Sequence, residues 1–183
     1  MNRTEFWELL DRTRLGCGED SAKQAELLVT ELAKLSEREI LDYQDILDDL
    51  EDEAYIAELW DVAYIIAWGC GDDDFIDFRA WLIGQGRDIF ENALVNPESL
   101  VDLVEVGQKI TSEDLLYVAM YAYELRTGKG METMPKSKRF NKPSPQLKGI
   151  SSKDEDSRLK RFPKVAAKFW VWWQNNKDKW FLS

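Results

Sequence analysis

Residues that favour helix N-termini recur along the first 128 positions of the chain, and apolar residues follow each of them at spacings of three and four. Three pairs have the spacing of a capping box: Asn2 with Glu5, Ser21 with Gln24 and Ser36 with Glu39. No stretch shows the alternation of a strand bounded by turns. The sequence therefore predicts an all-α fold, a single-domain bundle of about seven or eight helices.

Two stretches are predicted to form the centre of this bundle. The first, about residues 52–68, is apolar nearly all round, as expected of a helix that is buried on most sides, and should stop at Gly69. The second should begin at the aspartates of residues 72–74 and run to about Leu94. A later helix should end near Thr127, with Gly128 in the stop position.

The composition changes after Gly128. Residues 129–157 contain three prolines, many lysines and few apolar residues, which is typical of a linker or a loop along the surface. Residues 158–183 are basic and rich in tryptophan, and a helix over about 158–175 would be amphipathic. We therefore divide the chain into an acidic helical body (1–128), a Pro/Lys-rich linker or surface loop (129–157) and a C-terminal amphipathic helix (158–183), which belongs to the same domain and packs on the body.

Charge is distributed unevenly between these parts. Residues 1–130 carry 30 acidic and 11 basic residues, a net charge of −19, whereas residues 131–183 carry 5 acidic and 13 basic residues, a net charge of +8. An acidic body repels nucleic acid, because contacts with phosphate need Lys and Arg, so no nucleic-acid partner is expected. The body suits a basic protein partner, or the protein's own basic tail.

The absence of histidine restricts the chemistry that is open to the chain. It excludes an imidazole base, a Ser–His or Cys–His pair and a His ligand for zinc, and leaves carboxylates, Lys, Arg, Tyr or a lone Cys. Cys17 and Cys70 form no metal-spaced set, which suits thiols in a reducing cytoplasm. The first residues show no secretory signal core, and the most apolar stretch, residues 62–70, is too short to span a bilayer. We expect a cytoplasmic protein without cofactor, metal or catalytic residues, and we favour a role other than catalysis.

One cation is expected inside the core. At 100° per residue, Arg79 falls in the middle of the apolar face of the second central helix. A buried arginine is very costly unless acceptors satisfy it. Asp61, on an apolar part of the first central helix, is the predicted partner in a buried ion pair, and Glu58 is the second choice.

An alternative role for Arg79 is to floor a pocket for an anion or a carboxylate. Gln85 and Arg87 would lie at the rim, and Gly86 would leave a gap beside the guanidinium. Asp72 and Asp73, in the GDDD run, could act there as acid, base or Mg²⁺ ligands. That run lacks the spacing of an EF-hand loop and suits the capping of a helix better than a metal site.

Residues 63–87, AYIIAWGCGDDDFIDFRAWLIGQGR, resemble the signature of an uncharacterised bacterial family catalogued as domain of unknown function 4240, typically GCSDDxFxxFRxWLIxxGRxxF. Residues 6–10, 96–100 and 160–163 also fit, whereas Gly71 stands where the family usually has serine. The resemblance implies a bacterial, cytoplasmic, helical protein and carries no activity or catalytic residue with it. It directs attention to five motif positions: Asp72, Asp73, Arg79, Trp81 and Arg87.

Three functions remain open. The first is an interaction protein that binds and neutralises a basic protein partner, as an immunity protein does, because an acidic body acts by charge complementarity and needs no catalytic group. The second is a small-molecule or anion-binding protein, or an enzyme, that uses the region of Arg79, Asp72 and Asp73. The third is a membrane-surface or scaffold role of the C-terminal helix, which is less favoured because uncovered apolar patches of this size are rare on soluble proteins. The oligomeric state cannot be predicted from the sequence.

Overall fold

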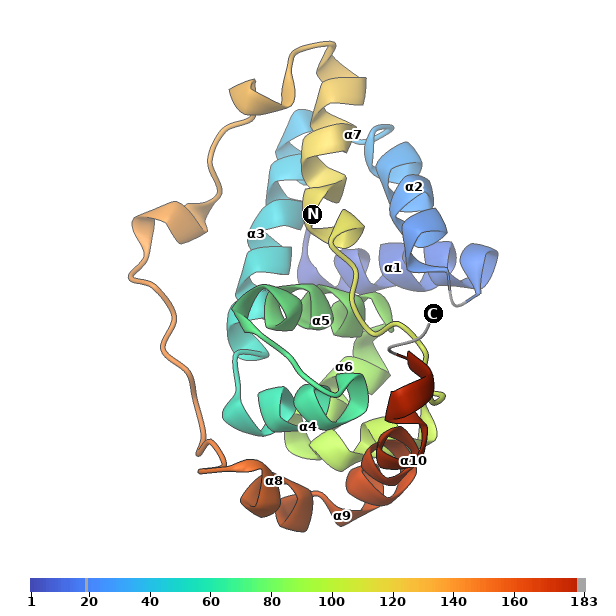
Figure 1. Ribbon diagram of the computed structural model, residues 1–183. Coiled ribbons are helices and arrows are strands. Elements are labelled where there is room, and N and C mark those ends of the chain that lie inside the picture. Colours follow the sequence, from blue (N-terminus) through green and yellow to red (C-terminus); the bar gives the residue numbers. More distant parts are fainter. Residues whose placement is uncertain (19, 181–183) are drawn as a thin grey trace.

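The computed structural model describes residues 1–18 and 20–180, with side chains up to residue 176. Within these residues the chain is helical and forms no strand, so the all-α prediction is confirmed (Figure 1). An isolated bridge joins Ile56 to Lys148. The helical segments outnumber the seven or eight that we predicted, because two of the expected helices are interrupted. The predicted C-terminal part, residues 158–183, extends beyond the described residues at 181–183.

The first three helices are α1 (Arg3–Cys17), α2 (Ser21–Leu32) and α3 (Glu37–Glu53). Capping boxes at Asn2 and Ser36 open α1 and α3, as predicted. The predicted box of Ser21 with Gln24 is wrong. Asp20 caps α2 by accepting the N–H of Lys23, and Gln24 is buried and donates from Nε2 to the carbonyl of Gly84.

The two central stretches form three helices rather than two. The first is α4 (Ala57–Ala67), which is shorter than expected because α3 continues to Glu53. The second is divided into α5 (Asp72–Gly84) and α6 (Arg87–Val95) at Gly86, whose φ of 93° is incompatible with a continuous helix. A 3₁₀ helix over Pro97–Asp102 follows. The core nevertheless centres on these helices, because most of α5 is buried.

Helix α7 (Val118–Thr127) continues from a 3₁₀ helix, Asp114–Tyr117, and ends at Gly128 in the left-handed conformation, as predicted. It packs against α2 and α3 in the upper half of the molecule, while α4, α5 and α6 fill the centre and the lower half (Figure 1).

Residues 129–154 run along the outside of α3 and α4, with short 3₁₀ turns at Met131–Thr133 and Lys138–Asn141 (Figure 1). Together with α8 (Glu155–Arg161) they form what we call the basic segment, residues 129–161. Its cations pair with a row of α3 carboxylates: Lys138 with Asp45 at 2.6 Å, Lys142 with Asp49 at 2.6 Å and Arg139 with Asp52 at 2.9 Å. The positively charged part of the chain thus covers an acidic part of its own body.

The C-terminal helix packs on the body, as predicted, although it is not continuous. It consists of α8, α9 (Pro163–Val165), a π-helical turn (Ala166–Trp170) and α10 (Val171–Trp180). The interruption falls at Phe162, which precedes a proline and so avoids helical dihedral angles. Phe169 is fully buried, Trp170 lies 6.2 Å from the ring of Tyr64, and Trp172 stacks on Trp68 at 5.2 Å. The aromatic face of the C-terminal helix is therefore covered by α4.

Among the described residues, no helix combines the length and the apolar character that crossing a membrane requires.

Candidate functional site

Arg79 is buried on α5, as the helical pattern predicts, and only 4% of its surface is exposed. Its Nε donates to the carbonyl of Phe75 at 3.3 Å, and one terminal nitrogen donates to the carbonyl of Glu51 at 2.7 Å. The other terminal nitrogen lies 3.4 Å from the Glu51 carboxylate. The predicted Asp61–Arg79 ion pair is wrong, and so is the second choice, Glu58. The partner is Glu51, which lies near the end of α3.

Glu51 is a buried carboxyl group with an incomplete set of partners. It is 2% exposed, and its Oε1 accepts no hydrogen bond within the described part of the chain. Burial raises the pKa of Glu51 to about 7, although the positive charges of Arg79 and Arg139 act in the opposite direction. The same burial lowers the pKa of Arg79. For both groups, the cost of removing the charge from water therefore outweighs the stabilisation by neighbouring charges.

A cavity of about 290 Å³ lies beside Arg79. Asp72 at the start of α5 and Arg139 from the basic segment line it together with Arg79. Its apolar walls include Tyr55 and Trp60, and the guanidinium of Arg79 lies over the Tyr55 ring at 5.0 Å. We call this cavity the Arg79 pocket. Two of our predicted site residues, Asp72 and Arg79, thus meet in one cavity.

Gln85 and Arg87, the predicted rim of that pocket, lie elsewhere. They line a second cavity, of about 440 Å³, next to α1. Gly86 does not leave space beside Arg79 either, because a Cβ atom at Gly86 would lie 2.8 Å from Oδ1 of Asp11. The cause is the break at Gly86, which turns these residues away from the face that carries Arg79. Trp81 is 2% exposed and packs 5.8 Å from the Phe78 ring, so it belongs to the core.

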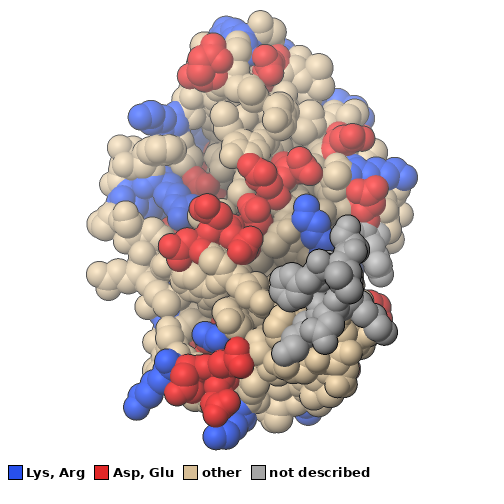
Figure 2. Space-filling view, in the orientation of Figure 1, with Lys and Arg blue, Asp and Glu red and all other residues tan. Residues whose placement is uncertain are grey.

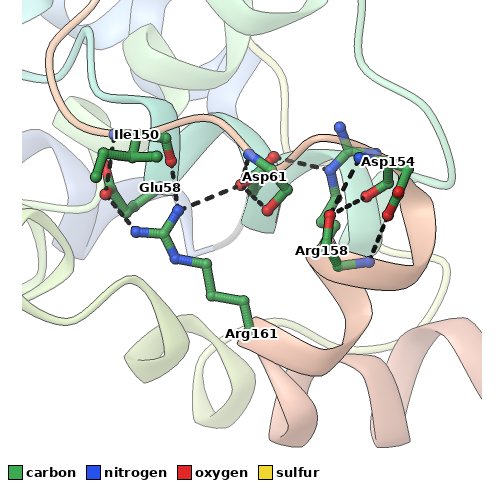
Figure 3. A network of polar contacts seen from close by, with 8 residues as sticks. Glu58, Asp61, Ile150, Asp154, Arg158 and Arg161 are labelled. Carbon is green, nitrogen blue, oxygen red and sulfur yellow. Dashed lines mark hydrogen bonds and ion pairs between the residues drawn. The ribbon is translucent and has the colours of Figure 1, made fainter.

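Asp61 and Glu58 bind the basic segment instead (Figure 3). Asp61 is 4% exposed and accepts Arg158 Nε at 2.8 Å, as well as the backbone N–H and the hydroxyl of Ser152 at 3.1 and 2.6 Å. Arg161 reaches from α8 to Glu58 and to the carbonyl of Ile150. Figure 3 shows this guanidinium between the carboxylates of Glu58 and Asp61. These contacts and the α3 row define the clamped surface: Asp45, Asp48, Asp49, Asp52, Glu58 and Asp61.

A second group of carboxylates has a different environment. Asp73 and Asp74 begin α5 with Asp72, Asp77 lies one turn later, and the backbone N–H of Ser112 donates to the carbonyl of Asp77, which brings Glu113 alongside. Burial and the negative charges of Glu113, Asp74 and Asp73 raise the pKa of Asp77. We call this group the acidic face: Asp72, Asp73, Asp74, Asp77 and Glu113. None of its members forms an ion pair with any described residue.

Figure 2 shows acidic side chains gathered across the middle of one side of the molecule, where Figure 1 places the beginning of α5 and the segment before α7. An exposed apolar stripe follows directly in the chain. Tyr117, Tyr121 and Leu125 are spaced by four residues and are 40%, 45% and 64% exposed. The Tyr117 and Tyr121 rings lie 6.4 Å apart. We call these three residues the α7 stripe. The sequence showed the helix but not that these three side chains would be exposed.

A third cavity was missed by sequence reasoning. It has a volume of about 710 Å³ and lies between the basic segment and the helices α3 and α7. Met120, Met134 and Phe140 provide apolar lining, and Gln44 and Asp48 provide polar lining. Residues from three separate parts of the chain form it, so that no local motif marks it.

Two further kinds of site are a metal centre and a reactive thiol. They contain no group of three or more His, Cys, Asp and Glu side chains arranged to hold a metal ion. Burial and the charge of Asp74 raise the pKa of Cys70 to about 12, so that its thiol is protonated at neutral pH.

The molecule is thus a helical protein in which family-signature residues line a small pocket and an acidic face. The chain belongs to the family described as "Protein of unknown function (DUF4240)", whose model matches residues 1–125. No curated protein matches the chain, and neither does any solved structure. The matched residues include the Arg79–Glu51 pair, the acidic face and the α7 stripe, whereas the basic segment lies outside them.

Proposed function

We propose that the chain is an interaction protein that binds and neutralises a basic protein partner, as an immunity protein does. The observation that carries the proposal is the acidic face, five carboxylates that form no ion pair with any described residue, although Lys109 lies near enough to Asp77 to oppose the rise in its pKa. Unpaired charge of one sign on one surface speeds the encounter with an oppositely charged partner and fixes its orientation.

A comparison with the clamped surface supports this proposal. The clamped surface has its counter-ions within the chain, and its carboxylates are occupied by Lys138, Arg139, Lys142, Arg158 and Arg161. A basic partner would have to displace this packed segment in order to bind there. The acidic face requires no such displacement, so its negative charge is within reach of a partner.

The α7 stripe gives the same surface an apolar component. Contiguous exposed apolar side chains rimmed by polar residues are typical of protein interaction sites, and aromatic residues are enriched at the centre of interfaces. Tyr117 is four residues from Glu113, so charged and apolar contacts would be available to one partner.

The test compares two triple variants in affinity purification from the native host, together with inspection of the neighbouring genes for a basic protein. One variant neutralises the acidic face: Asp73→Asn, Asp77→Asn and Glu113→Gln. The control removes the same charge from exposed carboxylates elsewhere: Glu8→Gln, Glu26→Gln and Asp88→Asn. We expect a basic protein to be retained by the wild type and by the control, to be lost from the face variant and to elute with salt.

Retention of the same protein by the face variant would rule out the acidic face as the binding surface. Recovery of no basic protein with the wild type, or of complexes that are indifferent to salt, would count against the function itself.

The Arg79 pocket favours a second function, the binding of a small anionic ligand. A guanidinium has five N–H donors, and the hydrogen bonds and the ion pair of Arg79 account for three of them. Thermal-shift measurements with acetate, phosphate and apolar carboxylates would test this function. A ligand that raises the melting temperature of the wild type but not that of Arg79→Lys would support this function, because a lysine cannot offer the same planar set of donors. A panel without any effect on the wild type would remove this function.

The third function considered from the sequence, at a membrane surface, would need the apolar face of the C-terminal helix. Phe169 and Trp170 are 0% and 8% exposed against the body, so that we do not put this function forward.

A further inference from the structure

The Arg79 pocket contains charges of both signs. Arg79 and Arg139 contribute cations, and Asp72 contributes a carboxylate that forms no ion pair with any described residue. The rest of the lining is largely apolar and consists of Tyr55, Trp60, Ile76 and Pro145. A simple anion would be attracted by the two arginines and repelled by Asp72. The lining as a whole therefore suits a ligand that also carries a positive charge.

The positions of these groups limit the distance between the two charges of the ligand. Arg79 turns back toward the start of α5, since its Nε reaches the carbonyl of Phe75 and its guanidinium carbon lies 5.2 Å from the centre of the Phe75 ring. Asp72 is three residues before Phe75 on the same helix, about one turn and ~5 Å along the axis. Asp72 and Arg79 are thus on one helix, with the Arg79 side chain turned back toward the end that carries Asp72, which suits a ligand that carries both of its charges on a small frame.

The size and the walls of the pocket restrict the ligand further. A volume of about 290 Å³ is at the lower limit for small-molecule sites, which excludes a nucleotide or another large cofactor. Trp60 presents one wall and is itself fixed by stacking on Phe75, with ring centres 4.6 Å apart and planes inclined by 11°. A rigid aromatic wall favours an apolar or aromatic side chain on the ligand.

We propose that the Arg79 pocket binds a free apolar α-amino acid, with the ligand carboxylate on Arg79 and Arg139, the ammonium group on Asp72 and the side chain against Trp60 and Tyr55. This inference rests on the second function above, the binding of a small anion, and specifies the ligand class. The ligand carboxylate would bind the donors of Arg79 that Glu51 does not use. The ammonium group would give Asp72 an ion-pair partner, which it has with none of the described residues.

Calorimetric titration of the full chain with L-leucine and L-phenylalanine tests this assignment. N-acetyl-L-leucine keeps the carboxylate and lacks the ammonium group, whereas leucinamide keeps the ammonium group and lacks the carboxylate. We expect each free amino acid to bind at least tenfold more tightly than either analogue, because each analogue leaves one charge of the pocket unpaired.

Two neighbouring carboxylates provide matched variants. Asp72→Asn should weaken L-leucine about tenfold, because the ammonium group loses its partner, and should tighten the binding of N-acetyl-L-leucine, because the repulsion of an anion by Asp72 is removed. Asp73→Asn, which changes the next residue outside the pocket lining, should alter neither ligand.

The outcomes separate the two levels of the proposal. Equal affinity for L-leucine and N-acetyl-L-leucine, or equal effects of the two variants, would overturn the amino-acid assignment and leave anion binding in place. If neither the amino acids nor the simple carboxylates give a heat of binding, both the amino-acid assignment and anion binding are overturned.

Discussion

The clamped surface and the acidic face are two groups of carboxylates on one acidic body, and the structure treats them differently. On the clamped surface Asp61 is 4% exposed and is held by Arg158 and Ser152. On the acidic face Asp73 is exposed and has no ion-pair partner among the described residues. Both groups contain runs of acidic residues in the sequence, so the density of charge does not show which carboxylates a partner can reach. The difference between them is the basic segment, which begins more than 60 residues after Asp61 and pairs with the clamped surface.

The largest effect is expected where the C-terminal helix is anchored. Phe169 is fully buried, and Phe169→Ala should lower the free energy of unfolding by about 3–5 kcal/mol, because a cavity replaces the ring. Urea denaturation gives this value, and faster proteolysis within residues 129–157 would show that the basic segment has loosened. The nearby Val171→Ala, at a side chain that is 54% exposed, should stay within about 0.5 kcal/mol. Equal effects of the two substitutions would mean that this helix is not an anchor.

The second prediction compares one carboxylate from each surface. Asp61→Ala should cost about 3 kcal/mol, since it leaves Arg158 without its acceptor in a partly buried site. Asp73→Ala should change stability by less than about 0.5 kcal/mol. Urea denaturation of both variants at one pH measures the difference, and a loss at position 73 as large as that at position 61 would contradict the distinction between the two surfaces.

The third prediction concerns Glu51, next to the clamped row on α3. Its pKa is raised by burial from an ordinary value of 4.5 to about 7. Between these values the folded chain holds a proton that the unfolded chain has released. The contribution of Glu51 to stability is therefore fully present below about pH 4.5 and is lost as the pH rises through about 7.

Glu51→Gln removes this titration. Its stability relative to the wild type should shift in favour of the variant between pH 5 and pH 8, because the wild type then acquires a poorly compensated buried charge. Urea denaturation across this range is the measurement. A constant difference between the two proteins would show that Glu51 does not titrate there.

Local signals in the sequence were sufficient for much of the fold. The capping boxes at Asn2 and Ser36 and the glycine stop at Gly128 depend on residues within one turn of each other, and all three were predicted. The break at Gly86 was missed although the signal was present, because an apolar pattern runs through it from α5 into α6. The break at Phe162 was likewise indicated by Pro163, which disfavours helical angles at the preceding residue.

The partners in the candidate site could be predicted less well, for a physical reason. The burial of Arg79 follows from the periodicity of a single helix, and was predicted. Its acceptor, Glu51, depends on how α3 packs against α5, which the periodicity of α5 alone does not show. Asp61 pairs with Arg158 across 97 residues of sequence. No local pattern encodes such a contact, and the pattern favoured Arg79 instead.

The smallest effect is expected from charge repulsion within the acidic face. Asp77 lies among like charges. Burial raises its pKa, and the negative charges of Glu113, Asp74 and Asp73 raise it further. Glu113→Gln should therefore stabilise the protein by a few tenths of a kcal/mol at low ionic strength, and this gain should vanish in about 0.5 M salt as screening weakens the repulsion. On the clamped surface the sign should be reversed. Asp49→Asn removes the attraction of Lys142 and should destabilise slightly, again only at low salt. Thermal denaturation of both variants at two salt concentrations measures the two signs. If both variants destabilise, the acidic face is balanced by cations within the chain after all, and little charge would be left on it for a partner.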